Sequence, residues 1–185
     1  MQISKTKSKE REKFKLIRET ISSVDQENVK KNLELFLELF HKKKFKRDYI
    51  AIYWPLKNEI DIRSLRNKYQ LALPKCNQKK ELEFFAWDDS PLENDSEGIP
   101  SPDNDKLLSF KDISLILLPC LAMDRNLTRL GYGGGYYDKL RSEISWKEIT
   151  SIGILTSNCV SNNLLAKAEW DVALNGFITE KEIYV

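Results

Sequence analysis

The chain has 185 residues, of which 41% are hydrophobic and 10% aromatic. This composition excludes a disordered polypeptide and provides enough apolar side chains for a packed core. The formal net charge of +2 is lower than that of most nucleic-acid-binding proteins, although residues 1–47 carry 14 basic and 7 acidic side chains.

Two helices are expected before the first strand. Residues 5–20 form a highly charged candidate helix, and residues 26–44 place apolar side chains at helical spacing. The apolar run at 48–54 ends at Pro55 and predicts a buried strand. A short helix at 61–69 is expected to follow it.

The middle of the chain is predicted to add strands. Residues 71–75 fit a strand, and residues 81–87 fit an edge strand. Residues 88–106 hold seven acidic side chains and one lysine among prolines and turn residues, which indicates a surface loop. Residues 113–118 (ISLILL) are the most hydrophobic run, and we expect them to form a central strand.

Predicted helices and strands also alternate in the last third of the chain. A glycine-rich turn at 131–135 precedes a candidate helix at 136–144 and a strand at 150–155. A short helix at 163–168 and a last strand at 177–179 complete the prediction. Alternating helices and strands, several of them apolar throughout, predict an α/β fold: a three-layer sandwich with a mostly parallel central sheet and helices on both faces. With no clear linker, residues 1–185 are expected to form one domain.

Cysteine and histidine usage limits the chemistry. The three cysteines are far apart and form no CxxC motif, which argues against a disulfide framework or a zinc site. The N-terminus has no apolar signal segment, and the longest apolar run, residues 113–123, is about half of the ~20 residues that a membrane span needs. We therefore expect a cytoplasmic protein. Because His41 is the only histidine, carboxylates, lysines, arginines, backbone amides or a bound ion must do any chemistry.

Four of the seven glycines fall within residues 131–135, in the string RLGYGGGYYD at 129–138. Glycines allow positive φ and a close approach of ligand to backbone, and successive free amides bind anions. Arg129 adds a fork of donors suited to phosphate. The pattern indicates a phosphate cradle, but it fits neither GxGxxG nor the P-loop, and a tight strand-to-helix turn without a ligand remains open.

Two carboxylates are candidate magnesium ligands. Asp138 falls in the first turn of the expected helix, where it would complement the helix dipole or bind magnesium beside phosphates. Asp171 is the second candidate, although taken alone it would be an ordinary loop carboxylate.

The RLGYGGGYYD string, with LLPCLAMD at 117–124 before it, resembles the 5-formyltetrahydrofolate cyclo-ligase family, also called methenyltetrahydrofolate synthetases. The match extends along nearly the whole chain. It includes Lys7 and Arg11 as K-x-x-x-R, YWP at 53–55, EID at 59–61, LPK at 73–75, IPSP at 99–102, WD at 170–171 and ITE at 178–180. The chain departs from the family where Cys120 and Leu127 replace glycine, Met123 replaces phenylalanine and Trp170 replaces histidine.

The resemblance implies an enzyme that converts 5-formyltetrahydrofolate to 5,10-methenyltetrahydrofolate with ATP and Mg²⁺, releasing ADP and phosphate. It implies ATP binding by Lys7, Arg11, Arg129, Leu130, Gly131, Tyr132, Gly133, Gly134, Gly135, Tyr136 and Tyr137, with Arg129 and Tyr137 as catalytic residues. It implies folate binding by Trp54, Glu59, Tyr132, Gly133, Gly134, Gly135 and Tyr136, and metal binding by Asp138 and Asp171. A flat aromatic face suits a pterin, and a carboxylate suits its N–H donors.

Two other function classes stay open at this point. A relative of the sugar-phosphate isomerases would use the glycine-rich turn for phosphate but would need no ATP, so the Lys7 and Arg11 pair argues against it. A non-enzymatic nucleic-acid binder would use the basic N-terminal region, although Glu10, Glu12 and Glu19 interrupt it. We expect a folate as the small-molecule partner, no nucleic-acid or membrane partner, and a monomer.

Overall fold

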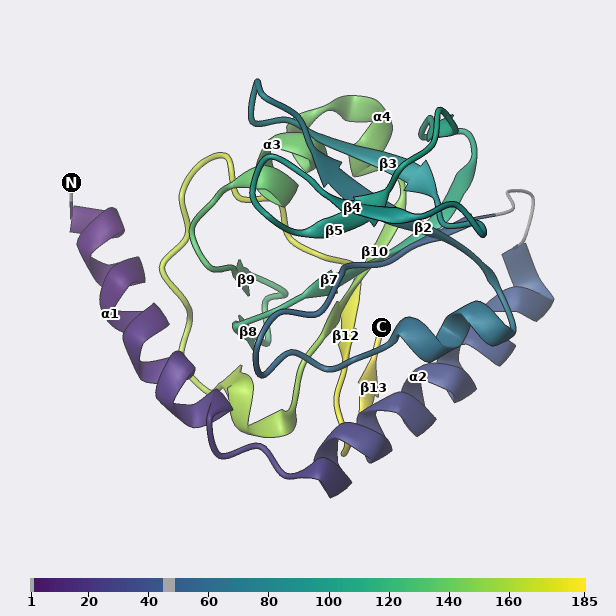
Figure 1. Cartoon of the computed structure of the whole chain (residues 1–185). Helices are drawn as coiled ribbons and strands as arrows, with labels where there is room; N and C mark the ends of the chain where they lie inside the picture. The colour runs from purple at the N-terminus through teal and green to yellow at the C-terminus, as the bar shows by residue number, and fades with distance from the viewer. Residues whose placement is uncertain (1, 45–48) are drawn as a thin grey trace.

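The computed structural model describes residues 2–44 and 49–185 and is built around an eight-stranded sheet (Figure 1). Along the sheet the strands follow in the order β13 (Ile183–Tyr184), β12 (Gly176–Ile178), β10 (Thr150–Ile154), β7 (Ile113–Pro119), β1 (Tyr49–Ala51), β2 (Gln70–Cys76), β3 (Leu82–Ala86) and β6 (Leu107–Leu108). The five strands from β12 to β2 are parallel to one another, and the three outer strands pair antiparallel.

Helices cover both faces of this sheet. The elements are α1 (Gln2–Arg18), α2 (Ser23–Lys44), α3 (Tyr136–Ser142), α4 (Ile144–Lys147) and the 3₁₀ turns η1 (Arg63–Asn67) and η2 (Ser157–Cys159). Apolar side chains of α2 and η1 pack on one face, while Phe14 of α1 and Leu140 of α3 pack on the other. Figure 1 shows α1 on the left, α2 below the sheet and α3 with α4 above it. The α/β fold class is therefore confirmed.

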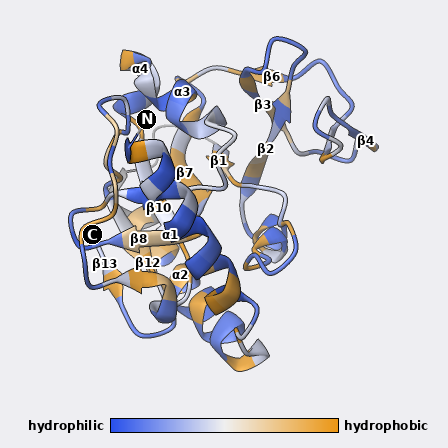
Figure 2. Ribbon diagram, turned by 90° about the vertical axis from the view of Figure 1, so that its left-hand side faces the viewer, coloured by the Kyte–Doolittle hydropathy of each residue, from blue (hydrophilic) through white to orange (hydrophobic). Residues whose placement is uncertain are grey.

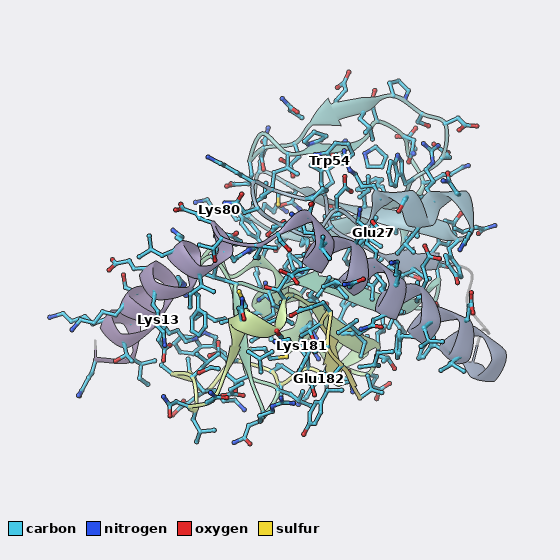
Figure 3. The ribbon with its side chains drawn as sticks, turned by 90° about the horizontal axis from the view of Figure 1, so that it is seen from below. Lys13, Glu27, Trp54, Lys80, Lys181 and Glu182 are labelled. Carbon is cyan, nitrogen blue, oxygen red and sulfur yellow. The ribbon has the colours of Figure 1, made fainter. Side chains whose placement is uncertain are left out.

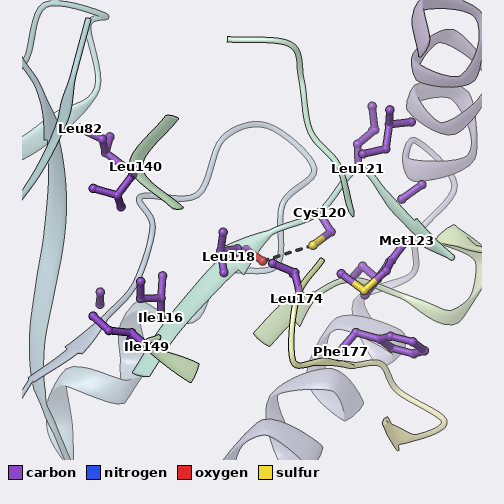
Figure 4. Packing of buried hydrophobic residues seen from close by; sticks show 14 of the residues in the cluster. Leu82, Ile116, Leu118, Cys120, Leu121, Met123, Leu140, Ile149, Leu174 and Phe177 are labelled. Carbon is purple, nitrogen blue, oxygen red and sulfur yellow. Dashed lines mark hydrogen bonds between the residues drawn. The ribbon is translucent and has the colours of Figure 1, made fainter. Parts of the chain in front are cut away.

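The place of β7 at the centre of the sheet explains why all its residues except Ser114 are apolar. Its successive residues alternate between the two cores: Leu115 and Leu117 face α2, whereas Ile116 and Leu118 face the α3 side. All four are fully buried, because a parallel sheet covered on both faces offers no solvated side. Figure 4 shows Ile116 and Leu118 within the second of these cores. The colours of Figure 2 contrast the largely hydrophilic α1 with the hydrophobic β12.

Several element predictions need correction. Strand β3 is not an edge, because β6 pairs with its outer side. The expected loop at 88–106 contains a hairpin of β4 (Leu92–Asn94) and β5 (Pro100–Pro102). The expected helix at 61–69 is the 3₁₀ turn η1, and the one at 136–144 ends at Ser142 and is followed by α4. Asp48, the first residue of the expected strand at 48–54, lies outside the described residues.

The helix expected at 163–168 is wrong. Its backbone amides donate to carboxylates instead of forming a helical ladder: Leu165 N donates to the distant Asp124 at 2.9 Å and Ala168 N donates to the nearby Asp171 at 2.7 Å. Leu165 and Ala168 are buried, so packing holds the segment in an irregular path. Tertiary contacts override local propensity here.

A second, three-stranded sheet was not expected from the sequence. It consists of β8 (Ala122–Asp124), β9 (Arg129–Leu130) and β11 (Val160–Ser161), with β8 in the middle. Strands of two or three residues are too short to show an alternating pattern. Strand β9 leads directly into the glycine-rich segment. Among the described residues, no helix combines the length and the hydropathy needed to cross a bilayer.

Candidate active site

A cavity of about 880 Å³ opens beside the carboxyl ends of β1, β2 and β7. Ligand sites of open α/β sheets lie at this edge. The cavity is lined by Ile3, Ser4, Lys7, Arg11, Tyr53, Trp54, Leu56, Glu59, Pro74, Cys76, Leu82, Asp95, Glu97, Ile99, Pro119, all residues from Arg129 to Asp138, and Ala168 to Asp171. The fold therefore gathers around one cavity every residue that the sequence singled out for a site.

The glycine-rich segment connects β9 to α3 along the cavity wall. Gly133 and Gly135 have φ values of 111° and 76°, a region that favours glycine. A Cβ on Gly133 would lie 3.4 Å from the guanidinium carbon of Arg11, and Arg11 Nε donates to the Gly131 carbonyl at 2.9 Å. The segment thus needs glycine both for its backbone and for its contact with α1.

Arg129 is fixed at the start of this segment. Its Nε donates to the Pro119 carbonyl at 3.1 Å, its Nη1 lies 3.5 Å from Oδ1 of Asp138, and its guanidinium lies 5.3 Å from the centre of the Tyr137 ring. Burial raises the pKa of the Tyr137 hydroxyl well above its usual value, and the nearby Arg129 offsets part of that effect. The hydroxyl therefore remains protonated at neutral pH.

Lys7 and Asp171 form a partly buried ion pair that connects α1 to the segment before β12. The same Asp171 oxygen accepts the amide of Ala168 at 2.7 Å. Arg141 of α3 donates to the carbonyls of Val172 and Ala173 at 2.9 and 3.1 Å. Helix α3 therefore anchors the residues directly after Asp171.

The carboxylates at the cavity could supply only part of the coordination shell of a hard cation such as Mg²⁺. In residues 2–44 and 49–185 no group of three or more His, Cys, Asp or Glu side chains could hold a metal ion by itself. Mg²⁺ commonly takes only one or two carboxylates and completes its shell with phosphate oxygens and water. Asp138 fits that role, because its side chain is 33% exposed and faces the cavity beside Arg129. Asp171 would have to exchange Lys7 for the metal.

The other end of the cavity combines an aromatic ring with a buried carboxylate. The Arg63 guanidinium lies 4.3 Å from the centre of the Trp54 ring, and Trp87 packs edge-on against Trp54 at 6.1 Å. One Glu59 oxygen accepts the Leu56 amide at 2.8 Å. The other, Oε1, is buried and has no hydrogen-bond donor among the described residues. Burial raises the pKa of Glu59, and an unpaired buried acceptor calls for a ligand donor.

Residues 3–180 match the model of the 5-formyltetrahydrofolate cyclo-ligase family. The chain belongs to this family. A 5-formyltetrahydrofolate cyclo-ligase of Haemophilus influenzae is 25% identical over 175 residues, covering 89% of this chain and 92% of that protein. The expectations of an enzyme and of this cyclo-ligase family are confirmed.

Two solved structures of methenyltetrahydrofolate synthetases share the fold. The NMR structure of the Aquifex aeolicus 5,10-methenyltetrahydrofolate synthetase has a TM-score of 0.79 and 26% identity, covering 96% of this chain and 91% of that one. The Mycoplasma pneumoniae 5,10-methenyltetrahydrofolate synthetase has a TM-score of 0.71 and 24% identity, covering 94% and 98%.

The departures from the cyclo-ligase pattern are accommodated locally. Leu127 adopts a φ of 61°, the left-handed conformation that a glycine takes without strain. Cys120 and Met123 pack over Gly153, where a Cβ would lie 2.7 Å from the Cys120 sulfur and 2.5 Å from the Met123 methyl carbon. Trp170 lines the cavity and is 68% exposed.

One residue that contacts the cavity lining without belonging to it was not predicted from the sequence of this cyclo-ligase. Arg18 is 6% exposed and contacts both Glu59 and Tyr132. Lys7, Arg11 and Arg18 follow one another at i, i+4 and i+11, which places them on one face of a helix. This spacing could have indicated Arg18 from the sequence, but the many other basic residues of α1 obscured it.

Proposed function

We propose that this enzyme catalyses the ATP- and Mg²⁺-dependent cyclisation of 5-formyltetrahydrofolate to 5,10-methenyltetrahydrofolate, with release of ADP and phosphate. The observation that carries the proposal is the content of the single cavity described above. It combines three cationic side chains and glycine amides at one end with an aromatic ring and an unpaired buried carboxylate oxygen at the other. The family membership supports the reaction class.

The chemistry suits these residues because an N-formyl oxygen is a poor leaving group. Transfer of the γ-phosphoryl group breaks its bond to ADP and joins phosphorus to the formyl oxygen, which gives an iminium phosphate. The neighbouring folate nitrogen then attacks the formyl carbon, and the carbon–oxygen bond breaks as phosphate leaves. Phosphoryl transfer depends mainly on alignment and on stabilisation of charge, so the reaction needs no protein nucleophile.

Each cation has a separate part in this proposal. Arg129, already held by Pro119 and Asp138, presents a preorganised guanidinium to the transferring phosphoryl group. Arg11 and Lys7 bind the remaining phosphates from α1. The protonated Tyr137 hydroxyl donates a hydrogen bond at the reacting oxygens.

Asp138 is the residue best suited to hold Mg²⁺ beside the phosphates, with Asp171 as a second ligand once Lys7 moves to the nucleotide. The bound ion would neutralise phosphate charge. At the other end, Trp54 offers a face for the flat pterin, and Glu59 Oε1 accepts its N–H donors. Residues 132–136 contact both ligands, whereas Leu130 and Gly131 contact ATP alone.

One assay tests the proposal. The purified protein is mixed with 5-formyltetrahydrofolate, ATP and Mg²⁺, and the near-ultraviolet absorbance of the methenyl product is followed. We expect a signal that requires all three components. A protein without an ATP-dependent signal would refute the proposed reaction. We also infer that residues 1–185 act as one domain and as a monomer, which light scattering across a concentration series tests.

A further inference from the structure

Arg18 is the last residue of α1, and its side chain is buried between three segments that are far apart in the sequence. Its Nε and Nη2 donate to the carbonyl of Asn58 at 3.1 and 2.8 Å. Its Nη1 donates to the hydroxyl of Tyr132 at 2.6 Å and lies 3.9 Å from Oε1 of Glu59. A single guanidinium therefore connects α1, the 56–59 turn and the glycine-rich segment.

The 56–59 turn depends on this contact for its shape. Glu59 N donates to the Leu56 carbonyl at 3.0 Å, and the Glu59 carboxylate accepts the Leu56 amide at 2.8 Å. Asn58 has a φ of 65°, an uncommon conformation for a residue with a side chain. The two hydrogen bonds from Arg18 to the Asn58 carbonyl hold the turn in this conformation and so set the direction of the carboxylate.

We propose that Arg18 is a positioning residue for the folate end of the cavity, acting through Glu59 and Tyr132. The proposal rests on the proposed function, because it takes the ligand of Glu59 to be the folate. Arg18 leaves Oε1 without a hydrogen bond, because the guanidinium is held by Asn58 and Tyr132 with Nη1 at 3.9 Å from Oε1, beyond hydrogen-bond distance. It supplies a positive charge at 3.9 Å that favours the ionised form of the carboxylate while leaving Oε1 free to accept from the ligand.

The charge of Arg18 acts on the pKa of Glu59 in one direction and lowers it. Burial raises the pKa of Glu59, while the Leu56 amide, Arg18 and Arg129 lower it. The other titratable groups that interact with Glu59 are neutral: the hydroxyls of Tyr53, Tyr132 and Tyr137 and the buried thiol of Cys120. Without the Arg18 cation the pKa of Glu59 rises further, so Glu59 takes up its proton at a higher pH and loses its ability to accept from two ligand donors.

The test compares Arg18→Met and Arg18→Lys with the wild-type enzyme and with Lys13→Met. Lys13 is an exposed cation on the outer side of the same helix (Figure 3), so it controls for loss of charge on α1. For each protein, KM for 5-formyltetrahydrofolate and for ATP and kcat are measured between pH 5 and pH 8. Binding of 5-formyltetrahydrofolate without ATP is measured by titration calorimetry.

We expect Arg18→Met to raise KM and Kd for the folate about tenfold or more, the scale of lost hydrogen bonds to a charged group. KM for ATP should change less than about twofold. The pH below which folate affinity falls should move upward in Arg18→Met and stay near the wild-type position in Arg18→Lys, which keeps the charge but loses the fork of donors. Lys13→Met should match the wild type throughout.

A folate affinity and pH profile of Arg18→Met equal to those of the wild type would overturn the proposal, even if the melting temperature fell. Should Arg18→Met fail to fold, Tyr132→Phe removes one partner of the guanidinium and leaves the buried charge in place. We expect it to raise the folate KM, and an unchanged folate KM in that variant would contradict the proposal. A wild-type enzyme without ATP-dependent turnover would instead reject the proposed function itself.

Discussion

Lys7 of α1 and Asp171 of the segment before β12 form an ion pair across 164 positions of the chain. Both side chains are largely buried, and both were expected on the ATP and magnesium side of the site. The pair connects α1 to this segment. Under the proposed function it would be exchanged on binding, with phosphate taking Lys7 and the metal taking Asp171.

Replacement of Lys7 tests the first half of this exchange. Lys7→Ala should raise KM for ATP about tenfold, since one charged hydrogen bond to phosphate is lost, and should change KM for the folate much less. Steady-state kinetics with each substrate varied in turn measures both. Lys9→Ala is the matched control, because Lys9 is exposed on the same helix. An ATP KM equal to that of the control removes Lys7 from the nucleotide site.

Arg129 is expected to act mainly on the rate. Arg129→Ala should lower kcat by about 10²- to 10³-fold, the usual effect of removing one preorganised donor from a transition state, while circular dichroism stays that of a folded protein. Arg125→Ala serves as the control, because Arg125 lies four residues away and pairs with Glu182 outside the cavity. Near-normal turnover in Arg129→Ala would be incompatible with its catalytic role.

Asp138 is the proposed ligand of Mg²⁺, and its replacement tests that role. Asp138→Asn should shift the Mg²⁺ titration of activity to at least about tenfold higher concentration, because an amide is a weaker ligand of a hard cation than a carboxylate. The exposed Glu143, which directly follows α3, provides the control variant Glu143→Gln. Superimposable Mg²⁺ titrations for the two variants would show that Asp138 is not a ligand.

We expect the titration of Glu59 to make the free energy of unfolding depend on pH. Because burial raises the folded-state pKa of this carboxyl, its folded form binds its proton more tightly than the unfolded chain does. The wild type therefore loses stability from this group as pH rises from its unfolded pKa through the raised folded pKa. Glu59→Gln lacks this titration, so its unfolding free energy relative to wild type should improve from pH 4 to pH 7.

Urea denaturation across that pH range measures the difference. Exposed Glu12 gives the control variant Glu12→Gln, whose stability difference should stay nearly constant. The same Glu59→Gln variant should bind 5-formyltetrahydrofolate more weakly at neutral pH, because the carboxylate charge is lost. A stability difference that does not vary with pH would argue against a raised pKa.

Replacement of Gly133, compared with that of Gly98, distinguishes the effect of backbone strain from an effect on the site. Gly133→Ala places a side chain at a φ of 111° and 3.4 Å from Arg11, so it should cost about 1 kcal/mol or more of stability and strongly reduce turnover. Gly98 also has positive φ, at 76°, but a Cβ there meets no atom within 4 Å. Gly98→Ala should therefore lose stability but keep activity. Equal activity losses in both variants would mean that global destabilisation, not the cradle, is responsible.

The alternation of helices and apolar strands correctly predicted the sheet and its covered faces. Burial on both sides leaves a clear pattern in a strand such as 113–119, where every residue except Ser114 is apolar. The RLGYGGGYYD string predicted the family through its resemblance to the family's motif, and the positive φ at Gly133 and Gly135 explains why glycine stands at these two positions. These features are local, so they can be recognised from neighbouring residues alone.

Other features depend on contacts between distant segments. The irregular path of residues 163–168 is set by the carboxylates of Glu10, Asp124 and Asp171, which no local propensity reveals. The roles of Arg18 and the Lys7–Asp171 pair depend on where α1 lies against the cavity. The sequence by itself determined the fold class, the family and a set of candidate residues. The tertiary structure alone decided which charges meet, because the energy of an ion pair or a buried hydrogen bond depends on distance and burial rather than on separation along the chain.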